Sequence, residues 1–295
     1  MTSPADRLLR RLEWHVIRRL DGQLQGSYRT VFRGTGIDFA DLRTYTADDD
    51  VRHIDWNVTA RMDEPYVRQY TQDRDLTAWL VCDRSASMRL GAVGHPKDAV
   101  ATDLAVCLAR LFTQSGNRVG AILYDHRSHQ VIPPRTGRNH VLRLAHELTQ
   151  RPTSAADGRR TDLDAMLRLA GSMARQRSLI FVISDFIGDV DWEPALTRLG
   201  QRHEVVAVRV VDPSEIELPD LGLVLVEDAE TGEQLFADTG DPFFQQRLRA
   251  EVQERELAVA SSMRRAGASA FCVGTDEDLI ATLIDMVRRS KRRRV

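Results

Sequence analysis

The sequence has few cysteines, few aromatic residues and no long apolar run, and each shortage excludes a class of protein. Its 295 residues include 3 cysteines, Cys82, Cys107 and Cys272, which lie far apart within apolar patterns. Such a set fits neither a disulfide framework nor a zinc site, so we expect core thiols. No apolar run reaches the ~18 to 20 residues that cross a bilayer, and residues 1–19 carry Arg and Glu where a signal peptide is apolar. We therefore expect a cytoplasmic protein without membrane insertion.

Charge is balanced over the whole chain but unevenly placed. The formal net charge is −2, and every basic residue except Lys97 and Lys291 is an arginine. Six of the last eight residues are basic, so removing them from a net charge of −2 leaves −8 for the rest. A basic tail could bind nucleic acid, but an aromatic content of 6% and an acidic body provide neither stacking platforms nor a broad phosphate-binding face. A solvated helix end explains the tail without any partner.

From residue 76 onward, apolar runs of strand length alternate with helical patterns. The pattern predicts strands at 76–82, 119–124, 178–183, 204–211 and 268–273, and helices at 97–113, 138–148, 162–173, 192–199 and 276–288. A short run at 130–132 predicts an antiparallel edge strand. Repeated strand and helix units indicate an α/β fold with a doubly wound, mainly parallel sheet that has helices on both faces.

Three segments fall outside this alternation. Residues 7–20 have the apolar spacing of an amphipathic helix, and residues 22–74 read as short strands and loops. We therefore place one domain at 1–75 and a second at 76–295. Within the second, an insertion at about 213–240 contains a β-hairpin, with strands in 222–237 and a turn at 230–232, and a long charged helix follows at 243–265.

Polar side chains follow two strands that such a sheet brings side by side. With strand order 3-2-1-4-5-6, ligands bind where the order reverses, between the first and fourth strands. Asp83 follows the first strand and Asp185 follows the fourth. Neighbouring strands lie about 4.8 Å apart, so the two carboxylates should repel each other unless a proton or a cation intervenes.

Three hydroxyl groups could complete a cation site at this edge. Ser85 and Ser87 lie in the same loop as Asp83, and Thr161 stands at the start of the helix before the fourth strand. Five hard oxygen donors suit Mg²⁺ or Mn²⁺ better than zinc or copper. A carboxylate of a partner protein could fill a vacant coordination position.

Each candidate ligand also has a plainer interpretation. Asp83 to Ser87 could form an Asx or Ser turn, and Asp185 could cap a loop. Thr161 with Asp164 has the spacing of a capping box at the start of a helix. The metal hypothesis is favoured because all five residues are expected at one rim of the sheet.

The residues just named resemble two known patterns. Residues 83–87, Asp-Arg-Ser-Ala-Ser, resemble the Asp-x-Ser-x-Ser of the metal-ion-dependent adhesion site in von Willebrand factor A domains, with Thr161 and Asp185 matching its later Thr and Asp. Residues 34–45, 49–56 and 60–61 resemble the bacterial family called domain of unknown function 58. The order of the two patterns is also that family's.

The resemblance implies a cytoplasmic, metal-dependent protein-binding module with no catalytic activity. Its expected partners are a MoxR-type AAA+ ATPase and a client protein, in systems thought to act as chaperones for assembly. We expect Asp55, Trp56 and Arg61 to help fix the N-terminal region against the A-type domain by ion pairs and packing, with no part in chemistry. The alternatives are a Mg²⁺-dependent phosphatase-like hydrolase and a nucleic-acid adaptor. Phosphatases of the haloacid dehalogenase type use Asp-x-Asp, whereas the second position here is Ser85.

Overall fold

The computed structural model describes most of the chain. The described residues are 4–13, 38–46, 49–51, 54–62, 64–71, 76–91, 96–125, 129–150, 161–188, 190–215, 220–227 and 232–293. They fall into two compact units, one within residues 32–76 and one that joins the N-terminal helix to residues 77–295.

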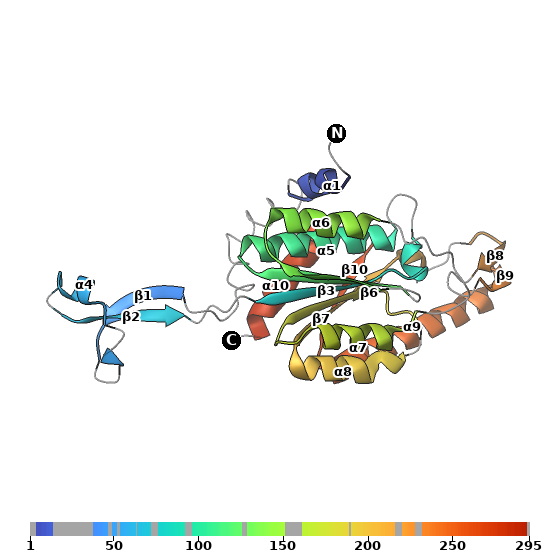
Figure 1. The fold of residues 1–295 in the computed structure, drawn as a ribbon. Coiled ribbons are helices and arrows are strands. Elements are labelled where there is room, and N and C mark those ends of the chain that lie inside the picture. The colour runs from blue at the N-terminus through green and yellow to red at the C-terminus, as the bar shows by residue number, and fades with distance from the viewer. Residues whose placement is uncertain are drawn as a thin grey trace. The chain divides into compact units, whose positions relative to one another are not determined.

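The larger unit is built on a six-stranded sheet with helices on both faces (Figure 1). Its strands are β3 (Thr77–Asp83), β4 (Arg118–Tyr124), β5 (His129–Arg135), β6 (Leu179–Ser184), β7 (Glu204–Val211) and β10 (Ser269–Gly274). Their order is β10-β7-β6-β3-β4-β5, which is the predicted 3-2-1-4-5-6 read from the other end. All neighbours are parallel except β5, which pairs antiparallel with β4 at one edge. The predicted doubly wound, mainly parallel sheet is therefore confirmed.

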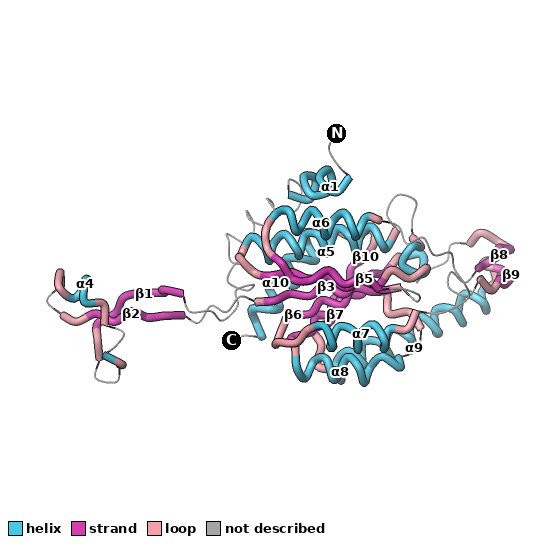
Figure 2. The backbone as a smooth tube through the Cα atoms, in the orientation of Figure 1, coloured by secondary structure: helices cyan, strands magenta, loops and turns pink. Residues whose placement is uncertain are grey.

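The central strands are apolar on both sides because helices cover both faces. The helices of this unit are α1 (Pro4–Leu12), α5 (Lys97–Gln114), α6 (Arg138–Thr149), α7 (Leu163–Met173), α8 (Glu193–Arg202), α9 (Pro242–Arg265) and α10 (Leu279–Arg293). Helices α5 and α6 lie on one face, while α7, α8 and α9 lie on the other, as the tube view shows (Figure 2). One continuous core joins Trp79 of β3 to Leu167 of α7, Leu199 of α8 and Met263 of α9.

Close packing explains one glycine in the middle of this sheet. A Cβ at Gly120 of β4 would lie 2.9 Å from the Trp79 ring and 3.0 Å from the carbonyl oxygen of Ile132. Any side chain there would push either the core tryptophan or the neighbouring edge strand out of place.

The N-terminal helix belongs to the larger unit, which corrects the expected domain at 1–75. Helix α1 buries Ala5, Leu9 and Leu12 and packs on α5 and α6. The Arg11 guanidinium also binds the Asp103 carboxylate of α5, at 2.6 Å. A short amphipathic helix needs such a partner surface, and the sequence pattern did not say which surface it was. The part of the expected helix at 14–20 lies outside the described residues.

The smaller unit consists of short elements, as predicted. Strands β1 (Asp38–Thr44) and β2 (Tyr66–Thr71) pair antiparallel, and a single helical turn, α4 (Trp56–Thr59), lies between them in sequence. Asp55 has a local role, since its carboxylate accepts the backbone N–H groups of Asn57 and Val58 as the N-cap of α4. Trp56 is 68% exposed, so it is not part of a core within the smaller unit, and its expected packing against the A-type domain stays a prediction.

An antiparallel hairpin projects after β7, as predicted. Strands β8 (Leu223–Glu227) and β9 (Gln234–Asp238) pair over five residues, and the expected turn at 230–232 lies largely outside the described residues. One cysteine prediction is wrong: Cys82 and Cys107 are buried, whereas Cys272 on the edge strand β10 is exposed. Among the described helices, none has the length and apolarity that a membrane crossing requires.

Candidate functional site

The two aspartates predicted to share one rim lie at the ends of adjacent strands. Strands β3 and β6 pair in parallel up to Cys82 and Ile183, so Asp83 and Asp185 leave the sheet at the same edge. The Asp83 carboxylate accepts the Ser184 hydroxyl of β6 at 2.7 Å and the Ser85 backbone N–H at 2.9 Å. The first hydrogen bond joins the ends of the two strands directly.

The two loop serines are brought to the same place. The Ser85 and Ser87 hydroxyl oxygens lie 2.9 Å apart, and both residues are buried. A single 3-10 turn, η3 (Ser87–Arg89), starts at the second serine and holds the loop. Arg84 anchors it from outside by donating to the Glu147 carbonyl oxygen near the end of α6, at 3.0 Å. Three of the five predicted ligands thus come from one compact loop.

The plain turn interpretation is correct for both aspartates, but it accounts for only half of each carboxylate. One oxygen of Asp83 accepts the N–H of Ser85, and one oxygen of Asp185 accepts the N–H of Ile187 at 3.1 Å, both Asx turns. The second Asp83 oxygen reaches Ser184 on the neighbouring strand. The second Asp185 oxygen accepts a hydrogen bond from Lys97 at 2.7 Å.

Lys97 is a residue of this rim that sequence reasoning missed. Its side chain is fully buried, and its ammonium donates to Asp185 and also to Glu215 of the short turn η5 (Pro213–Glu215). A signal did exist, since Lys97 is one of only two lysines in a chain that otherwise uses arginine. A lysine is a compact point charge, whereas arginine is a planar fork, so the choice matters at a buried position.

The electrostatics differ between the two carboxylates. Burial, followed by repulsion from Asp185, raises the pKa of Asp83 to about 7. Among the described residues no cationic side chain forms an ion pair with Asp83, whereas Asp185 has the Lys97 ammonium. A buried carboxylate with this environment takes either a proton or an added cation.

The backbone after β6 is strained at this site. Phe186 has a φ of 53°, a left-handed conformation that costs a bulky residue about 1–3 kcal/mol. Its N–H donates to the Ser184 hydroxyl at 3.0 Å. Its buried ring packs edge-on against the Trp192 ring, with the two ring centroids 5.3 Å apart. Packing of this ring therefore fixes the turn that presents Asp185.

Thr161 stands just before α7, but it does not cap that helix. The N-cap is Asp162, whose carboxylate accepts the Ala165 N–H at 2.8 Å. Asp164 instead pairs with Arg168 one turn later, at 2.5 Å. The expected capping box of Thr161 and Asp164 is therefore wrong, because the next residue supplies the cap.

The donor set suits a small hard cation. Asp83 offers a buried carboxylate beside two hydroxyls, and oxygen ligands of this kind are those that Mg²⁺ and Mn²⁺ take. The described residues contain no group of three or more His, Cys, Asp or Glu side chains arranged for a metal. A site here would therefore depend on serine and threonine hydroxyls.

The strand order, the antiparallel edge strand and the Asp-x-Ser-x-Ser loop define a domain of the von Willebrand factor A type. The chain belongs to the family described as protein of unknown function DUF58, whose model matches residues 41–258.

Mycobacterial proteins and solved structures are similar to this chain. An uncharacterised protein of Mycobacterium tuberculosis is 35% identical over 284 residues, covering 96% of this chain and 89% of its own length. An uncharacterised protein of Mycobacterium avium is 33% identical over 165 residues, covering 55% of this chain and 94% of its own length. The crystal structure of BatB from Bacteroides thetaiotaomicron has 15% identity and a TM-score of 0.49, covering 74% of this chain and 99% of that one. The von Willebrand A domain of SpRpn10 has 13% identity and a TM-score of 0.40, covering 72% of this chain and 95% of that one.

Proposed function

We propose that this protein is a metal-dependent protein-binding module. Asp83, Ser85, Ser87, Thr161 and Asp185 would hold Mg²⁺ or Mn²⁺, and an acidic residue of a partner protein would complete the coordination. The observation that carries the proposal is the buried Asp83 carboxylate, which has no cationic partner among the described residues and lies beside the hydroxyls of Ser85 and Ser184. When bound, the ion would supply positive charge that an incoming carboxylate recognises.

The expected partner is a MoxR-type AAA+ ATPase, acting with a client protein in the cytoplasm. This part of the proposal rests on membership of the family and on what resemblance to that family implies. In this role the chain would be an adaptor or assembly factor, and the ATPase would supply the energy.

A binding role is favoured over catalysis at the same rim. Phosphatases that use an aspartate after the first strand place a second carboxylate two residues later as the general acid or base. Ser85 occupies that position and its hydroxyl interacts with Ser87. A serine hydroxyl does not ionise near neutral pH, so it does not replace that carboxyl group as general acid or base.

The hairpin β8–β9 supports a protein partner from a separate observation. It exposes large apolar side chains, including Leu223 and Phe236, each 71% exposed, and Phe243 at the start of α9 is 82% exposed. A two-stranded hairpin is at best marginally stable in water, and clusters of exposed apolar side chains mark interaction surfaces.

Two measurements test the proposal. Titration calorimetry of the full chain with MnCl₂ should show saturable binding that Ser85→Ala weakens by at least about tenfold. Pull-down of a MoxR-type ATPase from the same genome should be lost with EDTA and with Ser85→Ala. The matched control is Ser172→Ala, which alters an exposed serine of α7 that donates only to the Leu169 carbonyl oxygen. Pull-down that is unchanged by EDTA, or by Ser85→Ala, contradicts metal-dependent binding.

A further inference from the structure

Strand β10 ends the large sheet and presents a backbone edge. It pairs with β7 on one side, and the described residues place no strand on its other side. The Thr275 N–H, just past β10, donates to the Val211 carbonyl oxygen. Because backbone groups alternate along a strand, those of Ala270 and Cys272 point away from β7. An edge of this kind is a template for another extended chain.

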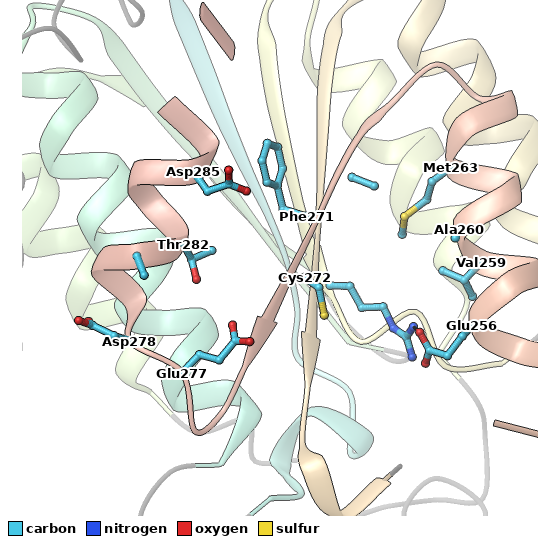
Figure 3. A pocket seen from close by; sticks show the side chains of 13 residues that line it. Glu256, Val259, Ala260, Met263, Phe271, Cys272, Glu277, Asp278, Thr282 and Asp285 are labelled. Atoms are coloured by element: carbon cyan, nitrogen blue, oxygen red, sulfur yellow. Dashed lines mark hydrogen bonds and ion pairs between the residues drawn. The ribbon is translucent and has the colours of Figure 1, made fainter. Parts of the chain in front are cut away.

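This edge forms the floor of a groove between two helices. Figure 3 shows β10 between α9 on one side and α10 on the other, with the exposed Cys272 thiol at the centre. The groove has a volume of about 620 Å³ and also includes Ala270 and Phe271 of the strand. The strand edge is thus accessible rather than covered by the two helices.

The α9 side of the groove is apolar. Val259, Ala260 and Met263 line it, and they lie on the face of the sheet to which Ala270 also belongs, because Ala270 is paired with the core residue Ala207. The one acidic residue on this side, Glu256, forms an ion pair with Arg209. Its charge is therefore already compensated.

The α10 side is acidic. Asp278 and Asp285 are seven residues apart, with Ala281 and Thr282 between them, and this spacing places all four along one face of the helix. Glu277 adds a third carboxylate, which also accepts the Gly274 N–H at 3.2 Å. Of the lining residues only Arg209 is basic, and it is paired on the opposite side.

We propose that the groove binds an extended segment of a partner protein as a seventh strand beside β10. Successive side chains of an added strand point to opposite faces of the sheet. Such a segment would therefore place apolar side chains toward α9 and basic side chains toward the carboxylates of α10. Its hydrogen bonds with Ala270 and Cys272 supply affinity, and the alternation of apolar and basic residues supplies specificity. The proposal does not require the metal, although Arg209, which lines the groove, donates from Nε to the carbonyl oxygen of Asp185 at 3.0 Å.

The experiment uses the full chain and a fluorescent peptide of alternating valine and lysine. Binding is followed by anisotropy, and the groove is located by the alkylation rate of Cys272, with the buried Cys82 and Cys107 as internal controls. We expect the valine and lysine peptide to bind saturably and to protect Cys272 from alkylation. A peptide of alternating valine and glutamate should neither bind nor protect Cys272. A valine and lysine peptide with N-methyl groups on the edge facing β10 should bind about tenfold more weakly.

Two protein changes separate the strand edge from the charge. Ala270→Pro removes an N–H that points away from β7, so the sheet keeps its own ladder while peptide affinity falls about tenfold. Ala281→Lys and Ala281→Glu form a matched pair at an exposed position between Asp278 and Asp285. The lysine variant should weaken binding of the valine and lysine peptide, and the glutamate variant should strengthen it.

Three results overturn the proposal. One is equal binding of the lysine and glutamate peptides. Another is peptide binding that leaves the alkylation of Cys272 unchanged. The third is protection of Cys272 in the protein alone as its concentration rises, with dimers in sedimentation, which would assign the groove to a second copy. Because N-methylation alters only the peptide, the test stands even if Ala270→Pro lowers the thermal stability of the protein.

Discussion

The Lys97 ammonium lies 2.7 Å from the Asp185 carboxylate, and both side chains are buried. The same ammonium also binds Glu215, so one cation serves two carboxylates at the rim where the metal is proposed. Asp83, on the adjacent strand, has no such partner among the described residues. The rim therefore holds one carboxylate that is paired with a lysine and one that takes either a proton or an added cation.

The first prediction concerns that built-in cation. Lys97→Met should lower the stability of the metal-free protein by about 3 kcal/mol, because it leaves buried carboxylates unpaired. A divalent ion should restore more stability to this variant than to the parent, because it replaces the lost positive charge. The ion stabilises the protein because it binds the folded chain in preference to the unfolded chain. Thermal unfolding with and without MnCl₂ measures both effects.

The control is Arg10→Met, which removes an exposed ion pair with Asp6 and should cost less than about 1 kcal/mol. Equal stabilisation of Lys97→Met and the parent by Mn²⁺ would show that the ammonium and the metal do not share Asp185.

The second prediction is the pH dependence of metal binding. With a pKa of about 7, Asp83 carries a proton below neutral pH, and the metal must displace it. The apparent affinity for Mn²⁺ should therefore fall by about tenfold for each pH unit below 7 and level off above it. Calorimetry in buffers of different ionisation enthalpy should also detect proton release. Ser85→Ala should weaken binding at every pH and move the midpoint upward, because a hydrogen bond from the Ser85 side chain lowers the pKa of Asp83. A flat profile would exclude Asp83 as the ligand that titrates.

The third prediction separates helix capping from metal binding at α7. Asp162→Ala should reduce stability by about 1 kcal/mol, because its carboxylate caps the helix, and should leave metal affinity unchanged. Thr161→Val should weaken Mn²⁺ binding and change stability less. Chemical unfolding and calorimetry on both variants provide the comparison. If Thr161→Val instead lowered stability and left Mn²⁺ affinity unchanged, while Asp162→Ala weakened Mn²⁺ binding, Thr161 would be a structural residue and not a ligand.

The fourth prediction concerns the exposed apolar side chains of the hairpin. Leu225 and Phe236 are paired across β8 and β9 and both are exposed. Replacing both by threonine should change stability by no more than about 0.5 kcal/mol and should reduce binding of a hydrophobic dye. Ala237→Asp on β9 is the contrasting variant, since Ala237 is buried and a charge there should destabilise the protein. A large loss of stability in the threonine variant would mean that these side chains support the fold itself.

The hydrophobic periodicity of the chain was enough to predict the strands of the large sheet and the helices that cover it. Strands such as β7 are apolar on both faces because helices cover both sides, and that pattern is visible in the sequence as a continuous run. Once strands and helices alternate, the handedness of the crossover connections leaves few strand orders. Asp83 and Asp185 could therefore be placed at one rim from their positions after the first and fourth strands.

Three-dimensional packing decided what local pattern could not. Lys97 reaches Asp185 across 88 residues of sequence, and the pairing of Lys97 with Glu215 spans 118. In neither pair do the two residues belong to the same helix or strand, so the spacing of residues within one element could not predict the contact. Only the folded chain brings these charges together. The same holds for α1, whose apolar face required a partner that the sequence did not name. Periodicity thus determined the elements and the rim of the sheet where their ends meet, while long-range contacts determined which charges lie at that rim.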